Sequence, residues 1–133
     1  MQGRQRILTV ASLLARAGLH AQTNPFSDDA RQTYALIKPT LLRAAEKMPE
    51  AYYSFRTVSE VRTFGEMIAH IADAQLRMCA VVKGESVTAN EAAKTSKADL
   101  IAALQASFDY CDPVYASMTD EAAPPGLSGR VGR

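Results

Sequence analysis

The sequence predicts an all-α protein, an antiparallel helical bundle with three main helices. Apolar residues recur with helical spacing in three long segments, start or stop signals flank those segments, and no segment has a strand pattern. A chain of 133 residues is long enough for one domain, and a hydrophobic content of 47% is sufficient for a packed core.

The charge balance gives no support for nucleic acid as a partner. The chain has 15 basic and 14 acidic residues, a formal charge of +1, whereas a phosphate-binding surface needs a net basic patch. Beyond the N-terminal segment, no apolar run reaches the roughly 18 residues that cross a membrane. We therefore expect no membrane span after signal cleavage.

Residues 1–22 predict an export signal. Arg4 and Arg6 give this segment a positive start, and a short apolar run follows from Ile7 to Ala15. Ala21-Gln22 is a plausible cleavage point. Arg16 and Leu19 depart from the usual pattern, so an ordinary N-terminal helix is the alternative. A signal predicts a periplasmic or secreted protein, and the alternative predicts a cytoplasmic one.

The first helix is expected over about residues 28–47. Ser27 is a good cap, and Asp28 and Asp29 favour the positive end of the helix dipole. Pro39 removes a backbone donor and should kink the helix. One stripe holds its apolar positions: Tyr34, Ile37, Leu41, Ala44, Ala45 and Met48.

Residues 50–62 are expected to form a loop after Met48-Pro49. We interpret its aromatic side chains, Tyr52, Tyr53 and Phe55, as a lid over one end of the bundle. A ligand-facing tyrosine is the alternative.

The second helix, within residues 63–85, has the most regular pattern. Thr63 and Glu66 match a capping box, and Lys83-Gly84 is a stop signal. Its predicted stripe is Phe64, Met67, Ile68, Ile71, Gln75, Met78, Cys79 and Val82.

His70 lies at the edge of that stripe, with Glu66 at i−4 and Asp73 at i+3. A solvated histidine between two acids is one interpretation. The other is a metal ligand or proton carrier at the mouth of the bundle, with Asp73 or Glu66 holding its second imidazole nitrogen.

The third helix is expected to begin at Ser96, and Pro113 should bend or split it. Its stripe comprises Leu100, Ile101, Leu104, Phe108, Cys111, Tyr115 and Met118. The period stops there, and residues 119–133, with two prolines and three glycines, are expected to be a disordered tail.

Two cysteines cannot make a disulfide framework, and neither belongs to a Cys-x-x-Cys pair. Cys79 and Cys111 both fall at core-facing positions, where free cysteine behaves as a small hydrophobe. A single bridge between them is the alternative if the protein is exported.

Several segments resemble the DinB-like family over residues 24–118. They are residues 42–50, 53–56, 61–65, 70–74, 97–100 and 107–111, and the run over 63–73 is the most specific. The resemblance implies a four-helix bundle with zinc or nickel at one end, held by three histidines. The first maps onto His70, and the others form an i, i+4 pair on the last helix. Characterised members are thiol-dependent S-transferases or isomerases, which implies a thiol or other small-molecule substrate.

The sequence departs from that pattern because its only other histidine is His20. We expect the fourth helix to be missing, as in a truncated gene, and the metal site to be incomplete, with Asp73 or Glu66 as a supporting ligand. The loss should expose an apolar stripe on the first and third helices and favour a homo-oligomer.

Two functions remain open, and the sequence does not decide whether the chain is an enzyme. One is a DinB-like metal-binding bundle whose activity is impaired by truncation. The other is a non-catalytic interaction module that self-associates through its open apolar face.

Overall fold

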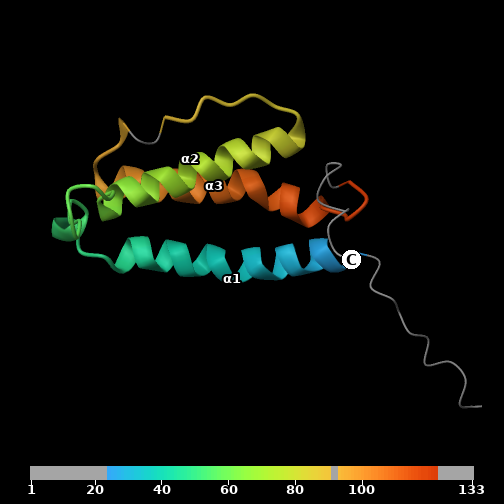
Figure 1. Ribbon diagram of the computed structural model, residues 1–133, viewed down its shortest axis with the longest axis horizontal. Helices are drawn as coiled ribbons and strands as arrows, with labels where there is room; N and C mark the ends of the chain where they lie inside the picture. The colour runs from blue at the N-terminus through green and yellow to red at the C-terminus, as the bar shows by residue number, and fades with distance from the viewer. Residues whose placement is uncertain (1–23, 91–92, 123–133) are drawn as a thin grey trace, which may run out of the picture.

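The structure, a computed structural model, describes residues 24–90 and 93–122. It contains three helices, α1 (Pro25–Lys47), α2 (Phe64–Lys83) and α3 (Lys97–Ser117), and a short 3-10 turn, η1 (Glu50–Tyr52). The helices form an elongated bundle (Figure 1). No strand occurs within these two ranges, which confirms the predicted all-α class. The expected signal segment, residues 1–22, lies outside the described residues.

The predicted ends of α2 and α3 are confirmed. The Thr63 hydroxyl accepts from the Glu66 backbone N–H, and the Glu66 carboxylate accepts from the Thr63 backbone N–H, so both halves of the capping box are present. Gly84 ends α2 with a left-handed φ of 69°, and Ser96 caps α3 through the Asp99 backbone N–H. These local signals therefore fix both helices.

The start of α1 differs from the prediction. The helix begins at Pro25 after Asn24, and Ser27 lies inside it, buried, instead of capping it. The Asp120 carboxylate accepts from the backbone N–H groups of Ser27 (2.7 Å) and Phe26 (3.2 Å) and from the Ser27 hydroxyl (2.6 Å). A carboxylate distant in sequence thus satisfies donors that an N-terminal turn leaves without intrahelical partners.

Asp120 belongs to the segment that we expected to be a disordered tail. Its own backbone N–H donates to the Asn24 side chain at 3.0 Å. The expected disorder therefore does not begin at Thr119, because residues 119–122 close against the start of α1. Residues 123–133 lie outside the described part of the chain.

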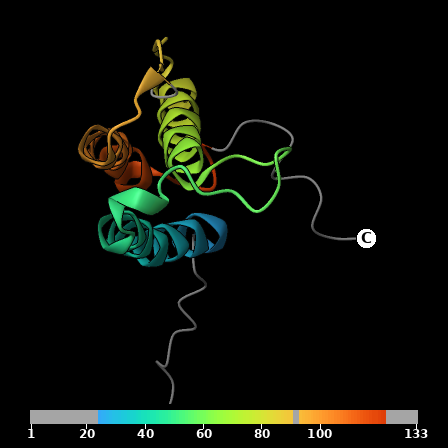
Figure 2. The same cartoon turned by 90° about the vertical axis from the view of Figure 1, so that its left-hand side faces the viewer.

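α3 is the central helix, because it packs against both α1 and α2. Viewed from the end of the bundle in Figure 2, the three helices occupy the corners of a triangle. The largest fully buried side chains all come from α3: Phe108, Leu100, Leu104 and Cys111. The core is therefore built around this helix.

Pro39 and Pro113 do not interrupt their helices. α1 continues from Pro25 to Lys47 through Pro39, and α3 continues from Lys97 to Ser117 through Pro113. Of the two effects expected of Pro113, the split of the third helix is therefore wrong, and the bend there and the kink at Pro39 stay predictions.

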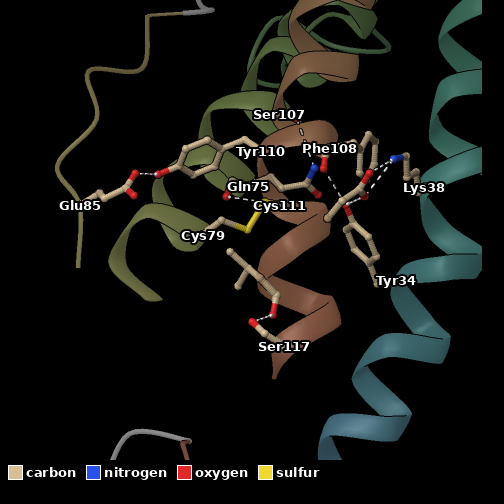
Figure 3. Close-up of a disulfide and its surroundings, with 12 residues drawn as sticks. Tyr34, Lys38, Gln75, Cys79, Glu85, Ser107, Phe108, Tyr110, Cys111 and Ser117 are labelled. Atoms are coloured by element: carbon tan, nitrogen blue, oxygen red, sulfur yellow. Dashed lines mark hydrogen bonds and ion pairs between the residues drawn. A yellow bond between two sulfur atoms is a disulfide. The ribbon is translucent and has the colours of Figure 1, made fainter. Parts of the chain in front are cut away.

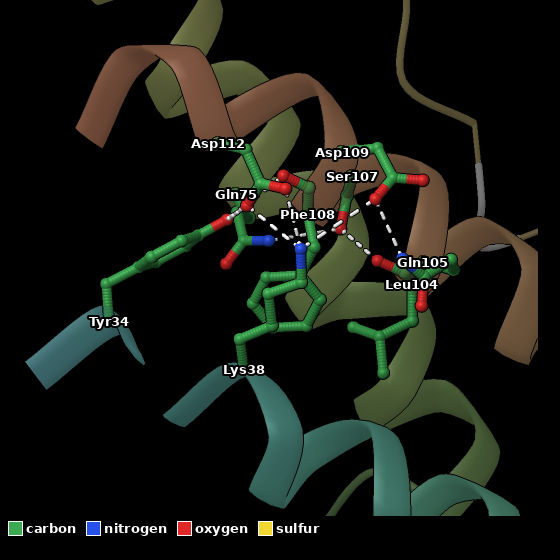
Figure 4. Close-up of polar contacts among 9 residues, drawn as sticks. All are labelled: Tyr34, Lys38, Gln75, Leu104, Gln105, Ser107, Phe108, Asp109 and Asp112. Atoms are coloured by element: carbon green, nitrogen blue, oxygen red, sulfur yellow. Dashed lines mark hydrogen bonds and ion pairs between the residues drawn. The ribbon is translucent and has the colours of Figure 1, made fainter. Parts of the chain in front are cut away.

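Polar contacts join α1 to α3. Lys38 Nζ lies 2.7 Å from Asp112 Oδ2, and the Tyr34 hydroxyl donates to Asp112 Oδ1 at 2.8 Å (Figure 4). The hydrogen bond from Lys38 has the largest effect on Asp112 and, together with the Tyr34 bond, holds the pKa of this carboxyl below its usual range although burial acts in the opposite direction. Burial and then Asp112 raise the pKa of Tyr34. Asp112 therefore stays ionised beside a phenol that stays protonated.

Cys79 and Cys111 form a disulfide between α2 and α3, with 5.5 Å between their Cα atoms (Figure 3). Both cysteines are buried. The sequence left open whether the two cysteines are free or bridged, and the structure has them bridged.

Large apolar side chains are exposed on α1, as expected, and on α2. The expectation of an open apolar stripe on the third helix is wrong. Large exposed apolar residues of the helices are Phe26, Leu36 and Ile37 on α1 and Met67, Met78, Val81 and Val82 on α2. α3 has none among the described residues, because its exposed positions carry small or polar side chains such as Ala102, Gln105 and Asp109. Met67, Met78 and Val82 were predicted to be buried as part of the apolar stripe of the second helix, but they are exposed.

Reducing the disulfide should destabilise the bundle. The bridge spans 32 residues, and closing a loop of that size in the unfolded chain corresponds to about 3 to 4 kcal/mol in the chain-entropy model. We expect the Cys79→Ser, Cys111→Ser double variant to lose a comparable free energy of unfolding, measured by urea denaturation. Dithiothreitol should destabilise the wild type but not this variant, and equal midpoints for wild type and variant would contradict the prediction.

Asp120→Asn should lower the melting temperature at neutral pH. Burial raises the pKa of Asp120, but hydrogen bonds from Ser27 and Phe26 outweigh it and lower the pKa overall. Its stabilising effect is therefore present above the ordinary aspartate pKa of about 3.9 and is lost as the pH falls through the lower folded value. The deficit of the variant should shrink in acid. Glu121→Gln, at an exposed neighbour, is the matched control, and a pH-independent deficit would contradict the mechanism.

Candidate binding groove at the start of α2

An open groove of about 740 Å³ lies beside the first half of α2. Its lining residues come from the end of the preceding loop and from α2: Glu60, Val61, Arg62, Glu66, Met67, His70 and Asp73. All three predicted site residues, His70, Glu66 and Asp73, therefore line one cavity. Loop residues 60–62 also line the groove, but they were not predicted as site residues. Their position directly before the Thr63 cap could have indicated that they lie beside the first turn of α2.

The loop that forms one wall is anchored by Tyr53. This side chain is buried, its hydroxyl donates to the Ala45 carbonyl at 2.6 Å, and its ring packs edge-on against Phe64. The Gly65 backbone N–H donates to the Tyr53 carbonyl at 2.8 Å, and a Cβ at Gly65 would lie only 3.2 Å from that oxygen. A glycine at this position therefore permits the close approach of the loop to the first turn of α2.

The predicted aromatic lid is present only in part. Tyr53 packs over the end of the bundle, whereas Tyr52 and Phe55 are more than half exposed. Neither the lid nor the alternative of a ligand-facing tyrosine describes the groove, because none of these three residues lines it.

The three predicted residues differ in burial. His70 is exposed, and its ring is accessible to a solute in the groove. Asp73 is only 6% exposed although it lines the same cavity. The groove thus presents an accessible imidazole near a carboxylate that is largely removed from water.

Glu66 is already engaged by the helix start. Its Oε2 accepts from the Thr63 backbone N–H at 2.6 Å. That bond, then the Thr63 hydroxyl, and more weakly the charges of Arg56 and Arg62, hold the pKa of Glu66 below its usual range. Glu66 therefore contributes a fixed negative charge to the groove wall, and binding a ligand would compete with the cap.

The residues of the groove do not amount to the three-histidine site that the resemblance implies. Within residues 24–90 and 93–122, no group of three or more His, Cys, Asp or Glu side chains is arranged to hold a metal ion. Both cysteines are in the disulfide, and His20 lies outside these ranges. The described residues offer one imidazole, which is fewer protein ligands than zinc sites use.

Comparison with known families assigns the fold. A family model described as the DinB superfamily matches residues 37–130, which is most of the chain. The chain belongs to the DinB superfamily. The match runs from within α1 through α3 and includes every residue that lines the groove. No curated protein and no solved structure matches the chain.

No helix of this DinB-superfamily chain, among those that the structure describes, is long and apolar enough to cross a membrane.

Glu66→Ala should lower the melting temperature, because it removes the acceptor of the capping box. The folded pKa of Glu66 is lowered, so its stabilising effect is present above the ordinary glutamate pKa of about 4.3 and is lost as the pH falls through the folded value. The deficit should therefore be largest near neutral pH. Glu60→Ala removes an equal charge from the same groove without touching the cap. Equal melting curves for the two variants would contradict a capping role.

Proposed function

We propose that this chain is a divalent-metal-binding bundle of the DinB type, in which zinc or nickel binds weakly to His70 in the groove. The observation that carries the proposal is the accessible His70 imidazole in a cavity that it shares with the carboxylates of Asp73 and Glu66. Imidazole and carboxylate are ordinary zinc ligands. Glu66 would have to leave its helix cap to bind the ion, because its carboxylate accepts from the Thr63 backbone N–H.

The same geometry supports impaired activity. Catalytic zinc sites use three protein ligands and keep one position open, and the described residues supply no such set. We therefore propose that the chain shares an origin with thiol-dependent S-transferases and isomerases but has impaired activity. A thiol or other small molecule is the substrate class that the groove would accept, and turnover is expected to be low or absent.

A second candidate is a non-catalytic module that self-associates. It is favoured by the exposed apolar side chains Met67, Met78, Val81 and Val82 on α2. An exposed apolar face of this kind marks interaction surfaces on soluble domains.

Zinc titration of the full chain by isothermal calorimetry tests the first candidate. We expect about one weakly bound ion per chain in the wild type and no measurable binding in His70→Ala, because the variant removes the only accessible imidazole of the groove. His20→Ala is the matched control, since it removes the only other histidine of the chain.

Three outcomes contradict the metal proposal. They are no heat of binding in the wild type, equal binding in the wild type and His70→Ala, and loss of binding in His20→Ala alone. Circular dichroism should show the same helix content for His70→Ala as for the wild type, because the side chain is exposed.

A further inference from the structure

α2 carries two apolar faces. Toward α3 it buries mostly small side chains, Gly65, Ile68, Ala69, Ala72, Cys79 and Ala80. A second row follows separations of four, three, four and three residues and is here named the α2 seam: Met67, Ile71, Ala74, Met78 and Val81. A mean period of 3.5 residues is the spacing by which two helices pack along a coiled-coil seam.

The α2 seam is open to solvent. Met67 is 42% exposed, Met78 71% and Val81 77%, and Ile71 and Ala74 are half-buried. Neither of the other described helices covers it, because α3 contacts the opposite, alanine-rich face. Apolar side chains in this register gain free energy when another helix covers them.

We propose that the α2 seam binds the α2 seam of a second copy of this chain, with the two helices antiparallel. The inference rests on the second candidate function and specifies its partner and contact surface. An antiparallel pair centred between positions 72 and 73 is self-complementary, because Met67 of each copy then lies opposite Met78 of the other and Ile71 lies opposite Ala74. Such a contact closes as a symmetric dimer and leaves no unpaired seam.

Charge decides between the two orientations. Beside the seam, the exposed Glu66 lies in the first half of α2 and the exposed Arg77 lies in the second half. Lys83 points instead toward α3, where its ammonium lies 4.0 Å from the centre of the Tyr110 ring and pairs with Glu85. A parallel pair would place like charges side by side, whereas an antiparallel pair places the acidic half of each helix beside the basic half of the other. Antiparallel helix dipoles favour the same arrangement.

The small central residue permits close packing. Ala74 has a short side chain between the longer Ile71 and Met78, so the two helices can approach at the midpoint while the methionines fill the space on either side. His70 lies beside the seam and not in it, four residues before Ala74. Metal binding at His70 and pairing through the seam are therefore separable.

Sedimentation velocity of the full chain across a wide concentration range tests the pairing. We expect a monomer–dimer equilibrium that Met78→Glu weakens about a hundredfold or more, since each dimer would bury two charges without partners. Val81→Lys should act in the same direction. Leu36→Glu is the matched control, because Leu36 is equally exposed (72%) but lies on α1.

A wild type that stays monomeric overturns the proposal, as does a dimer that neither seam variant weakens, which would place the contact on another face. Circular dichroism should show unchanged helix content for all three variants. His70→Ala should dimerise like the wild type even if it binds no zinc, so the failure of one proposal does not imply failure of the other.

Cross-linking through introduced cysteines tests the orientation. A short bis-maleimide should link Met67→Cys to Met78→Cys when the two variants are mixed, and it should link neither variant to itself. Cys79 and Cys111 do not react because they are in the disulfide. Efficient linkage of Met67→Cys to itself would overturn the antiparallel arrangement.

Discussion

Close packing of α2 against α3 through alanine is the constraint on which the rest of the structure depends. Ala69, Ala72 and Ala80 are nearly inaccessible. Small side chains let two helix axes approach, and that approach brings the Cα atoms of Cys79 and Cys111 to 5.5 Å, within the range of a disulfide. Because α2 uses mostly small residues and Ile68 for this contact, several of its large apolar residues, Met67, Met78, Val81 and Val82, remain on the outer surface.

α1 is held in a different way. Only Ser27 and Ala45 are buried in this long helix, and half-buried residues such as Tyr34, Leu41 and Leu42 pack against the core. Polar contacts with α3 and the segment after it add to this packing. The Asp120 carboxylate holds its first turn, and Asp112 binds Tyr34 and Lys38 near its middle. These contacts require ionised carboxylates, so the position of α1 depends on pH more than the contact between α2 and α3, which is apolar and covalently bridged.

Local signals predicted more of this fold than hydrophobic periodicity did. Thr63, Gly84 and Ser96 were assigned correctly because capping depends on a few neighbouring residues. The stripe predicted on α2 is only partly buried: Ile68 and Cys79 are buried, whereas Met67, Met78 and Val82 are exposed. Large apolar residues dominate such a pattern, while much of the buried contact is made by alanine. The Asp120 contact could not be predicted, since it joins residues 93 positions apart. For the site, spacing on one helix placed His70, Glu66 and Asp73 together, but the wall formed by residues 60–62 depends on how the loop folds back.

Metal binding at His70 and pairing through the α2 seam both use the outer surface of α2, but they depend on different residues. A second copy paired through the α2 seam would cover Met67, Ile71 and Met78. In the antiparallel register that places Met67 opposite Met78, the residue opposite His70 is Gln75, and the two His70 side chains lie on opposite sides of the midpoint. The dimer would therefore bury apolar surface without adding a histidine or a carboxylate beside His70. Stability should rise with self-association while metal affinity stays that of a single imidazole with carboxylate support, because the two depend on different residues of one helix.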